Sequence, residues 1–254
     1  MSGSVSQMIS LNEIEQAQDR LSDHVERTPL IHSESLSAQS GVPVFLKLEN
    51  RQPTGSFKLR GATNAVLCLS GNERERGLVT ASTGNHGRAL AHAASTQGLT
   101  ATICLSSLVP RNKVEAIRAL GADVRIIGKS QDDAMEEVMR LVRDESMNAI
   151  PPFDDPRIIA GQGTVGLEIV EDLPELDTVL VPLSGGGLAA GVAAAVKAKL
   201  PQARVIGISM QRGAAMQASF EAGKPVNVEE LDTLADSLGG GIGLDNQWTF
   251  EMCR

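Results

Sequence analysis

The sequence predicts an α/β protein with mostly parallel sheets. Short apolar runs alternate with longer stretches of helical periodicity from residue 44 onward. Glycine-rich turns join two of the strands directly to the helix that follows each of them. The chain has 254 residues, 42% of them hydrophobic and 21% charged, which is typical of a folded globular protein.

The first expected element is a helix near the N-terminus. Ser10 and Glu13 form a capping-box pattern at its start, and Pro29 lies beyond its end. Its apolar stripe consists of Ile14, Ala17, Leu21 and Val25.

A compact α/β unit with a parallel sheet is expected next. Its strands are expected at 44–48, 77–81, 100–105 and 124–127. Its helices are expected at 57–69, with Ser56 as a plausible N-cap, and at 88–97, 112–120 and 130–144. Because strands and helices alternate, the strands should run parallel.

A second α/β unit follows Pro151 and Pro152, which punctuate the chain. Helices are expected at 156–172 and 187–200, and strands at 179–183 and 204–209. We expect the N-terminal helix to pack on this second unit. The proline pair is equally compatible with an ordinary surface turn.

Composition excludes several classes of protein. A net charge of −8, one Trp and no Tyr argue against a nucleic-acid binder. The three cysteines are widely spaced, which disfavours a disulfide framework or zinc site and fits a reducing cytoplasm. The N-terminus lacks the apolar core of a signal peptide, and no apolar run is long enough to span a membrane. The histidines His24, His32 and His92 lack metal-ligand spacing.

Lys58 is the leading candidate for a reactive side chain. It follows the Pro53–Gly55 turn and falls in the first turn of the helix expected at 57–69. The positive end of the helix dipole, together with burial, would lower its pKa. A neutral amine can attack a carbonyl to form a Schiff base. For a lone lysine, a solvated surface position is the ordinary alternative.

The sequence SGGGL, Ser184 to Leu188, joins a strand to a helix. Its glycines let backbone N–H groups approach an anion at a helix N-terminus, so a phosphate is the expected ligand. A tight turn that needs small residues is the alternative. Gly185, Gly187 and Ala190 also match a dinucleotide fingerprint, with Arg212 in reach of an NADP phosphate, although the expected acidic residue is absent.

The sequence STGNHG, Ser82 to Gly87, also lies between a strand and a helix. Its hydroxyl and amide groups and its flexible glycines suit a carboxylate. His86 has no visible carboxylate partner in the sequence, so we expect it to position the loop rather than to act as a base.

Four motifs in register carry a resemblance to a known family. They are GSFKLRGA around Lys58, STGNHG, GQGTVGLEI at 161–169 and SGGGL. From about residue 28 to 244 the chain resembles the fold-type II pyridoxal-phosphate enzymes, in the serine/threonine dehydratase and serine racemase group. The resemblance implies a tryptophan synthase β-like fold with two three-layer α/β/α domains. The domains would be a small one at 46–150 and a large one from 1–45 and 151–254.

The resemblance also implies roles for individual residues. Lys58 would hold pyridoxal 5′-phosphate as a Schiff base and take the Cα proton. Phe57 would pack near the cofactor ring, and Asn85 would bind its hydroxyl. The phosphate would be bound by Ser184, Gly185, Gly186, Gly187 and Leu188. The substrate carboxylate would be bound by Ser82, Thr83, Gly84, Asn85 and His86.

The implied reaction removes water and ammonia from a β-hydroxy α-amino acid to give a 2-oxo acid. Thr83 stands where the racemases place a serine, and a threonine hydroxyl is less free to rotate, so elimination is favoured over racemisation. The expected partners are an amino-acid substrate and further copies of the chain in a dimer or tetramer. An NADP-binding oxidoreductase and an inactive remnant remain as alternatives.

Three departures from the family pattern matter. Ser209 and Ala215 stand where racemase-like members carry acidic metal ligands, so no metal site is expected. The run Gly239 to Gly243 resembles the hydroxyectoine-utilisation dehydratases, which act on larger hydroxy amino acids. The chain stops at Arg254, before the family's C-terminal serine, so we expect the C-terminal part of the large domain to be missing.

Overall fold

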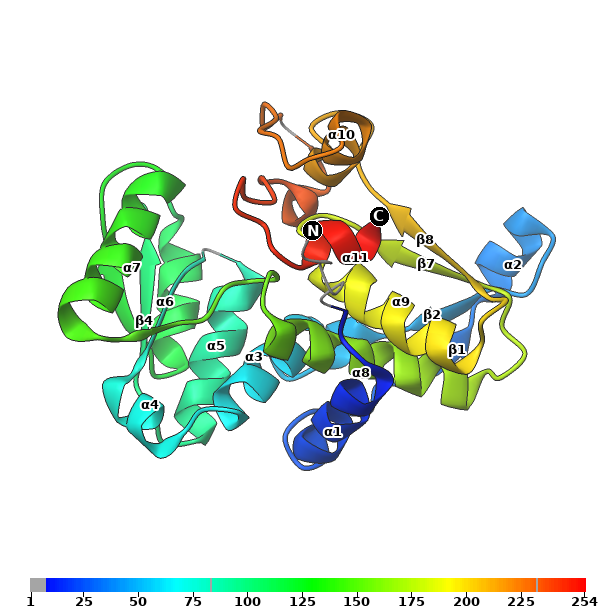
Figure 1. The fold of residues 1–254 in the computed structure, drawn as a ribbon, viewed down its shortest axis with the longest axis horizontal. Helices are drawn as coiled ribbons and strands as arrows, with labels where there is room; N and C mark the ends of the chain where they lie inside the picture. The colour runs from blue at the N-terminus through cyan, green and yellow to red at the C-terminus, as the bar shows by residue number, and fades with distance from the viewer. Residues whose placement is uncertain (1–7, 83, 232) are drawn as a thin grey trace, which may run out of the picture.

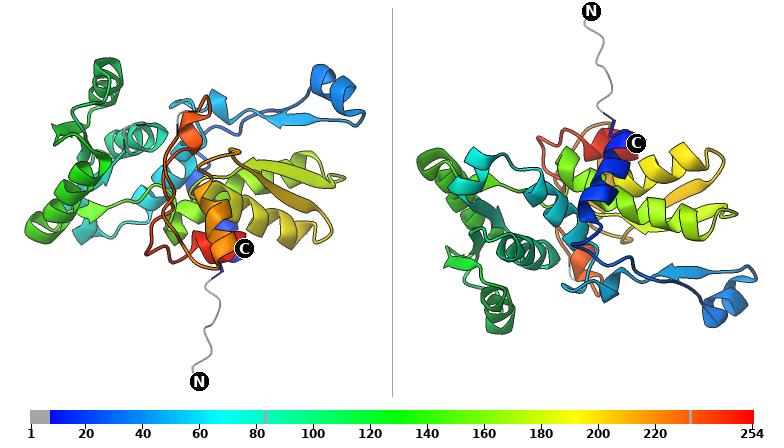
Figure 2. Two further views of the ribbon diagram at one scale, coloured as in Figure 1. Left: turned by 90° about the horizontal axis from the view of Figure 1, so that it is seen from above. Right: turned by 90° about the horizontal axis from the view of Figure 1, so that it is seen from below.

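A computed structural model describes residues 8–82, 84–231 and 233–254 (Figures 1 and 2). The helices are α1 (Leu11–Leu21), α2 (Glu34–Ser40), α3 (Lys58–Leu67), α4 (Gly71–Arg76), α5 (Asn85–Thr96), α6 (Arg111–Ala119), α7 (Gln131–Glu145), α8 (Pro156–Asp172), α9 (Gly187–Lys199), α10 (Ala215–Ala222) and α11 (Thr249–Cys253). The strands are β1 (Leu30–His32), β2 (Phe45–Lys47), β3 (Leu78–Ala81), β4 (Ala101–Leu105), β5 (Asp123–Ile126), β6 (Asn148–Ala149), β7 (Thr178–Pro182) and β8 (Arg204–Ile208). Within this described part, no helix is both long and apolar enough to cross a bilayer.

A parallel sheet with strand order β5-β4-β3-β6 forms one half of the molecule. Helices cover both of its faces, as Figure 1 shows, with α7 on one side and α5 and α6 on the other. The central strands β3 and β4 are buried along their whole length, which explains why they read as continuous apolar runs. Ile103 faces one apolar cluster and Val79 faces the other.

The other half contains two small sheets. Strands β7 and β8 run parallel, and β1 and β2 form an antiparallel pair. The expectation that the strand at 44–48 belongs to the parallel sheet is therefore wrong, because β2 pairs with the neighbouring strand β1 instead. Along β7, Val179 and Val181 are buried in a cluster that includes residues of α8 and α9. Leu180 points the other way and is exposed, as are Ile206, its partner on β8, and Ile208.

Helix α8 connects the two halves, because it packs against α1, α3 and α9. Glycines allow the closest of these approaches. A Cβ added to Gly161 would lie 2.7 Å from the Cα of Gly61 on α3. A Cβ added to Gly191 on α9 would lie 2.4 Å from the carbonyl oxygen of Ile159. The motif at 161–169 is therefore a helix-packing surface.

Most of the expected elements are present. The capping box of Ser10 and Glu13 is confirmed, α1 packs on α8 and α9 as expected, and α8 has the expected bounds. Helix α5 begins at Asn85, three residues earlier than expected. The expected cap at Ser56 is wrong, because α3 starts at Lys58 and no side chain caps it. The small-domain boundaries at 46–150 stay a prediction.

A buried network of charges fixes α3 to α8. The Arg60 side chain is 1% exposed, and its guanidinium binds Glu168 of α8 at 2.6 Å and Glu49 at 2.8 Å. Lys47 of β2 adds a second cation, 2.6 Å from Glu168. Two cations and two carboxylates balance one another, which is the condition for keeping ions out of water.

We expect Arg60→Met to lower the free energy of unfolding by about 3–5 kcal/mol, because it leaves two buried carboxylates with one cation between them. Urea denaturation followed by circular dichroism measures the loss. Arg111→Met is the matched control, since Arg111 forms an exposed pair with Glu115 and should cost no more than about 1 kcal/mol. Equal losses in the two variants would contradict the role given to the buried network.

Candidate active site

Residues 150–155, here called the connector, join β6 to α8 and contact several predicted site residues. The main-chain carbonyl of Pro152 accepts a hydrogen bond from Lys58 at 2.6 Å. The main-chain carbonyl of Ile150 contacts His86 at 2.9 Å. The Phe153 ring lies directly over Gly185. The connector therefore brings together three segments that are far apart in the sequence.

Lys58 is the first residue of α3 and is partly buried. Its Nζ lies 5.5 Å from the centroid of the Phe57 ring. Burial lowers the pKa of the Lys58 amine to about 8, because a charged ammonium loses its hydration there. The amine has a substantial neutral fraction near physiological pH.

The STGNHG segment forms the start of α5, with Gly84 as N-cap and Asn85 as the first helical residue. His86 is buried, and its Nε2 must carry the proton that it donates to Ile150, because a carbonyl only accepts. Desolvation, and then the charge of Lys58, lower the pKa of His86 to about 3, so the ring is neutral. Gly87 lets the Ser82 carbonyl approach closely. Thr83 lies outside the described residues.

The glycine loop, Ser184–Leu188, runs from the end of β7 into α9. Gly186 is the N-cap and has φ 91°, a conformation that favours glycine. A Cβ at Gly185 would lie 2.3 Å from the Phe153 ring, and one at Gly186 would lie 2.8 Å from Met216 and 2.9 Å from Thr249. Close packing thus explains why Gly185 and Gly186 carry no side chains.

Three helix starts in this region lack a side-chain cap, namely those of α3, α5 and α9. Ser10, Ser33, Ser70, Ser130 and Asp155 cap the helices that follow them, whereas α6 and α10 also start without a side-chain cap. The first N–H groups of an uncapped helix need an acceptor, and the positive end of the helix favours an anion. The α9 and α5 starts are therefore each suited to bind an anionic group.

Buried polar atoms beside Lys58 also lack partners among the described residues. These atoms are Thr54 Oγ1, Ser56 Oγ and His86 Nδ1. A buried polar atom without a partner is costly, so such atoms commonly bind a ligand. Arg88 of α5 lies against the same turn, where it donates to the carbonyl of Thr54 at 2.7 Å.

The sequence did not point to the connector as part of the site. Pro151 and Pro152 indicate only a boundary or a surface turn, and the contacts of Pro152 and Ile150 use main-chain carbonyls, which every residue has. Asp155 could have been recognised as the cap of α8 from the proline that follows it. No sequence signal identifies the contact between Phe153 and Gly185.

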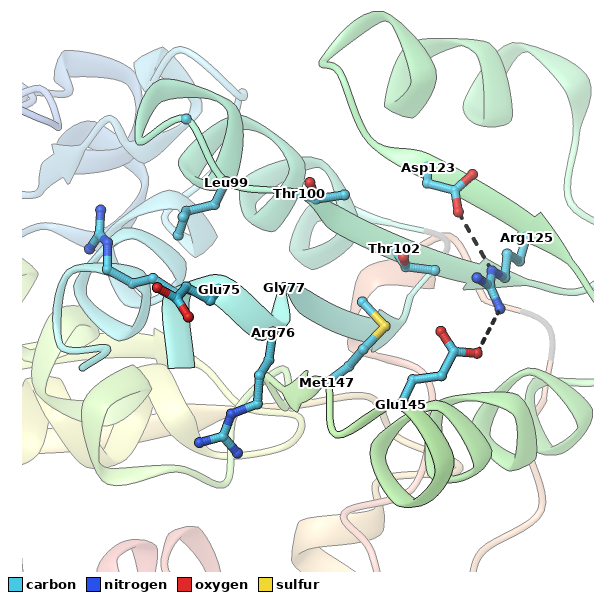
Figure 3. Close-up of a pocket in the computed structure, with 12 residues that line it drawn as sticks. Glu75, Arg76, Gly77, Leu99, Thr100, Thr102, Asp123, Arg125, Glu145 and Met147 are labelled. Atoms are coloured by element: carbon cyan, nitrogen blue, oxygen red, sulfur yellow. Dashed lines mark ion pairs between the residues drawn. The ribbon is translucent and has the colours of Figure 1, made fainter. Parts of the chain in front are cut away.

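A hollow of about 500 Å³ lies elsewhere, as Figure 3 shows. It is lined by Gly77, Thr100 and Asp123, which stand at the amino ends of β3, β4 and β5. Arg125 lies at one side of it and pairs with Asp123 and Glu145. Ligands of open parallel sheets bind at the carboxyl ends of the strands. This hollow is therefore at the wrong edge of the sheet and is separate from the Lys58 site.

A comparison with protein families matches residues 21–254 to the model for pyridoxal-phosphate dependent enzymes. Among curated proteins, one from Sinorhizobium fredii, provisionally named a threonine dehydratase, is 65% identical over 97% of this chain and 74% of its own length. An L-threonine ammonia-lyase of Thermotoga maritima is 43% identical over 97% of this chain and 61% of its own length.

The fold has solved counterparts as well. Maize serine racemase superposes with a TM-score of 0.90 and 35% identity, over 96% of this chain and 74% of that one. A processed threonine deaminase isoform of Solanum lycopersicum gives a TM-score of 0.89 at 36% identity, over 99% and 71% of the two chains. These matches confirm the fold class expected from the sequence.

We expect the reactivity of Lys58 toward an acylating anhydride to rise with pH around a midpoint near 8, because burial disfavours its protonated form. Mass spectrometry of the labelled peptide, taken from protein without cofactor, measures the midpoint. In urea-unfolded protein the midpoint should return to about 10.4, the value for a solvated lysine. The same high midpoint in the folded protein would contradict a desolvated amine.

Proposed function

The chain belongs to the pyridoxal-phosphate dependent enzyme family, and from this premise we propose that it is a lyase acting on β-hydroxy α-amino acids such as threonine and serine. It eliminates water from the substrate, and hydrolysis of the eliminated product then releases ammonia and leaves a 2-oxo acid. Its cofactor is pyridoxal 5′-phosphate. The site described above supports this function because it combines one desolvated amine with two uncapped helix starts.

The residues present fit the cofactor. Its phosphate would be held by N–H groups of the glycine loop at the start of α9, where no side chain competes for them. Its aldehyde would be held by Nζ of Lys58, and Phe57 lies beside that atom. The unpartnered Ser56 hydroxyl and His86 Nδ1 supply further polar atoms. Asn85, at the start of α5, would bind the ring hydroxyl.

The bound cofactor would act as the electron sink for the carbanion formed at the substrate Cα. Lys58 would supply the base. Because its pKa is about 8, Nζ can take a proton from Cα and return it near neutral pH. The Pro152 carbonyl accepts a hydrogen bond from Nζ and so fixes the side from which the amine reaches the substrate.

The start of α5 would bind the substrate carboxylate. Ser82, Gly84 and Asn85 lie where α5 begins, and its first N–H groups have no side-chain cap. His86 contributes as a neutral, fixed group, because its low pKa keeps it uncharged. Its bond to Ile150 ties the carboxylate loop to the connector. Thr83 would belong to the same loop and would also bind the substrate carboxylate.

The match to the pyridoxal-phosphate dependent enzymes argues against an NADP-binding oxidoreductase. An oxidoreductase would also leave Lys58 and the start of α5 without a role. A racemase is the second candidate, since maize serine racemase shares the fold. Racemisation needs an acid/base group on the opposite face of the substrate from Lys58. The threonine at position 83 is less mobile than a serine, so we keep elimination as the main reaction.

A finer proposal concerns the size of the substrate. The run from Gly239 to Gly243 has positive φ at Gly240 and Gly243, and Asn246 binds the carbonyl of Ile242 at 2.9 Å and the hydroxyl of Thr249 at 2.7 Å. Thr249 packs on Gly186, so this run is linked to the glycine loop. Residues without side chains would leave room for hydroxylated diaminobutyrate derivatives, which are larger than threonine.

Three further points belong to the proposal. The three cysteines are free thiols, which supports a cytoplasmic location. The chain assembles as a dimer or tetramer, which light scattering can measure. Residues 46–150 form the small domain, and 1–45 with 151–254 form the large one.

We expect borohydride reduction of the protein with pyridoxal 5′-phosphate to trap the cofactor on Lys58, seen as a mass increase of the peptide that contains it. Lys58→Ala should abolish the adduct and lower turnover of β-hydroxy amino acids by at least about 10²–10⁴-fold, because the proton transfer loses its base. Lys224→Ala, at an exposed position, is the control and should behave as wild type. An adduct on another lysine would contradict the assignment.

Steady-state release of ammonia from threonine, serine and hydroxylated diaminobutyrate derivatives tests the substrate. We expect kcat/KM to be highest for the larger compounds, because the run at 239–243 carries little side-chain volume. A preference for threonine would reject the finer proposal and leave the lyase function intact. No ammonia from any of them, in protein that holds the cofactor, would support an inactive remnant.

A further inference from the structure

We propose that Asp154 is a positioning residue that sets the distance between the Lys58 amine and the glycine loop. The inference rests on the proposed function, because it assigns Asp154 a part in the placement of the cofactor. Asp154 belongs to the connector and lies between Phe153, which covers the glycine loop, and Asp155, which caps α8.

The Asp154 carboxylate binds a segment more than ninety residues away in the sequence. Oδ2 accepts a hydrogen bond from the N–H of Gln247 at 2.7 Å, and Oδ1 accepts from the N–H groups of Trp248 and Thr249 at 2.9 and 2.8 Å. Hydrogen bonds to a charged acceptor are stronger than neutral ones. Asn246 Oδ1 accepts from the N–H of Phe250 at 2.9 Å, so Asp154 and Asn246 together satisfy the first N–H groups of α11.

The segment that Asp154 holds packs on the glycine loop at Gly186, whereas Phe153 packs on it at Gly185 and Gly187. Thr249 and Cys253 of α11 fill the space where a side chain of Gly186 would stand. The Cys253 thiol donates to the carbonyl of Gly186 at 3.5 Å. Moving α11 would therefore release the N-cap of α9, whose N–H groups face the phosphate in the proposed function.

The neighbouring residues show why Asp154 acts on both ends of the cofactor. Two residues earlier, the Pro152 carbonyl holds Nζ of Lys58. One residue earlier, Phe153 lies against Gly185 and Gly187. Because the backbone joins these contacts within three residues, fixing Asp154 to residues 247–249 fixes the amine and the loop relative to each other. An asparagine there could keep the acceptor for Trp248 and Thr249, but its amide would oppose the N–H of Gln247.

The test compares Asp154→Asn and Asp154→Ala with wild type, each first without cofactor. Trp248 is the single tryptophan, so its fluorescence reports the segment that Asp154 binds. Titration with pyridoxal 5′-phosphate then gives Kd, and turnover of the preferred amino acid gives kcat and KM. The control is Asp133→Asn, which removes a carboxylate that accepts backbone N–H bonds at the start of α7, away from the site.

We expect Asp154→Ala to shift the Trp248 emission and to raise the cofactor Kd at least about tenfold, the effect of losing charge-assisted hydrogen bonds. Asp154→Asn should give a smaller change in the same direction, and Asp133→Asn should leave both readouts as in wild type. A lowered melting temperature with unchanged Kd and emission would overturn the proposal, since Asp154 would then be merely structural. If wild type itself binds no cofactor, the proposed function fails instead.

Discussion

The site depends on keeping one amine out of water while giving it a single fixed acceptor. Lys58 meets this condition because α3 places it at a helix start and the Pro152 carbonyl receives its hydrogen bond. Burial makes proton loss easier, and the geometry leaves the nitrogen in one place. Two residues further along α3, Arg60 anchors the same helix to α8 through the buried carboxylate of Glu168. The Lys58 amine and the structural charges are thus positioned by one helix.

Much of the architecture could be predicted from the sequence. Continuous apolar runs marked β3 and β4, which are buried on both faces, and Ser130 marked the start of α7 because it caps that helix with its own side chain. Such signals depend only on residues that are neighbours in the sequence, so they can be recognised without the structure. Short elements such as β1 and α4 have too few apolar positions to produce a periodic pattern, and they were missed.

The sequence indicated some residues of the candidate site and not others, and the difference has a physical reason. Lys58, Asn85 and the glycine loop stand at strand or helix ends, where motif and geometry coincide. The connector contributes main-chain carbonyls and one carboxylate, whose partners are fixed only when the chain folds. The misplaced cap at Ser56 has a related cause. A hydroxyl before a helix usually satisfies that helix, but here it stays without a partner beside the reactive amine.

The outer face of the β7–β8 sheet has a consequence for the protein in solution. Leu180, Ile206 and Ile208 form adjoining apolar positions on two parallel strands, and parallel strands are ordinarily covered on both faces. Exposed strand faces and edges recruit other chains, so this region sets the colloidal behaviour of purified protein. Association through this face would appear as light scattering that grows with concentration. Charged replacements on this face offer a route to more soluble preparations.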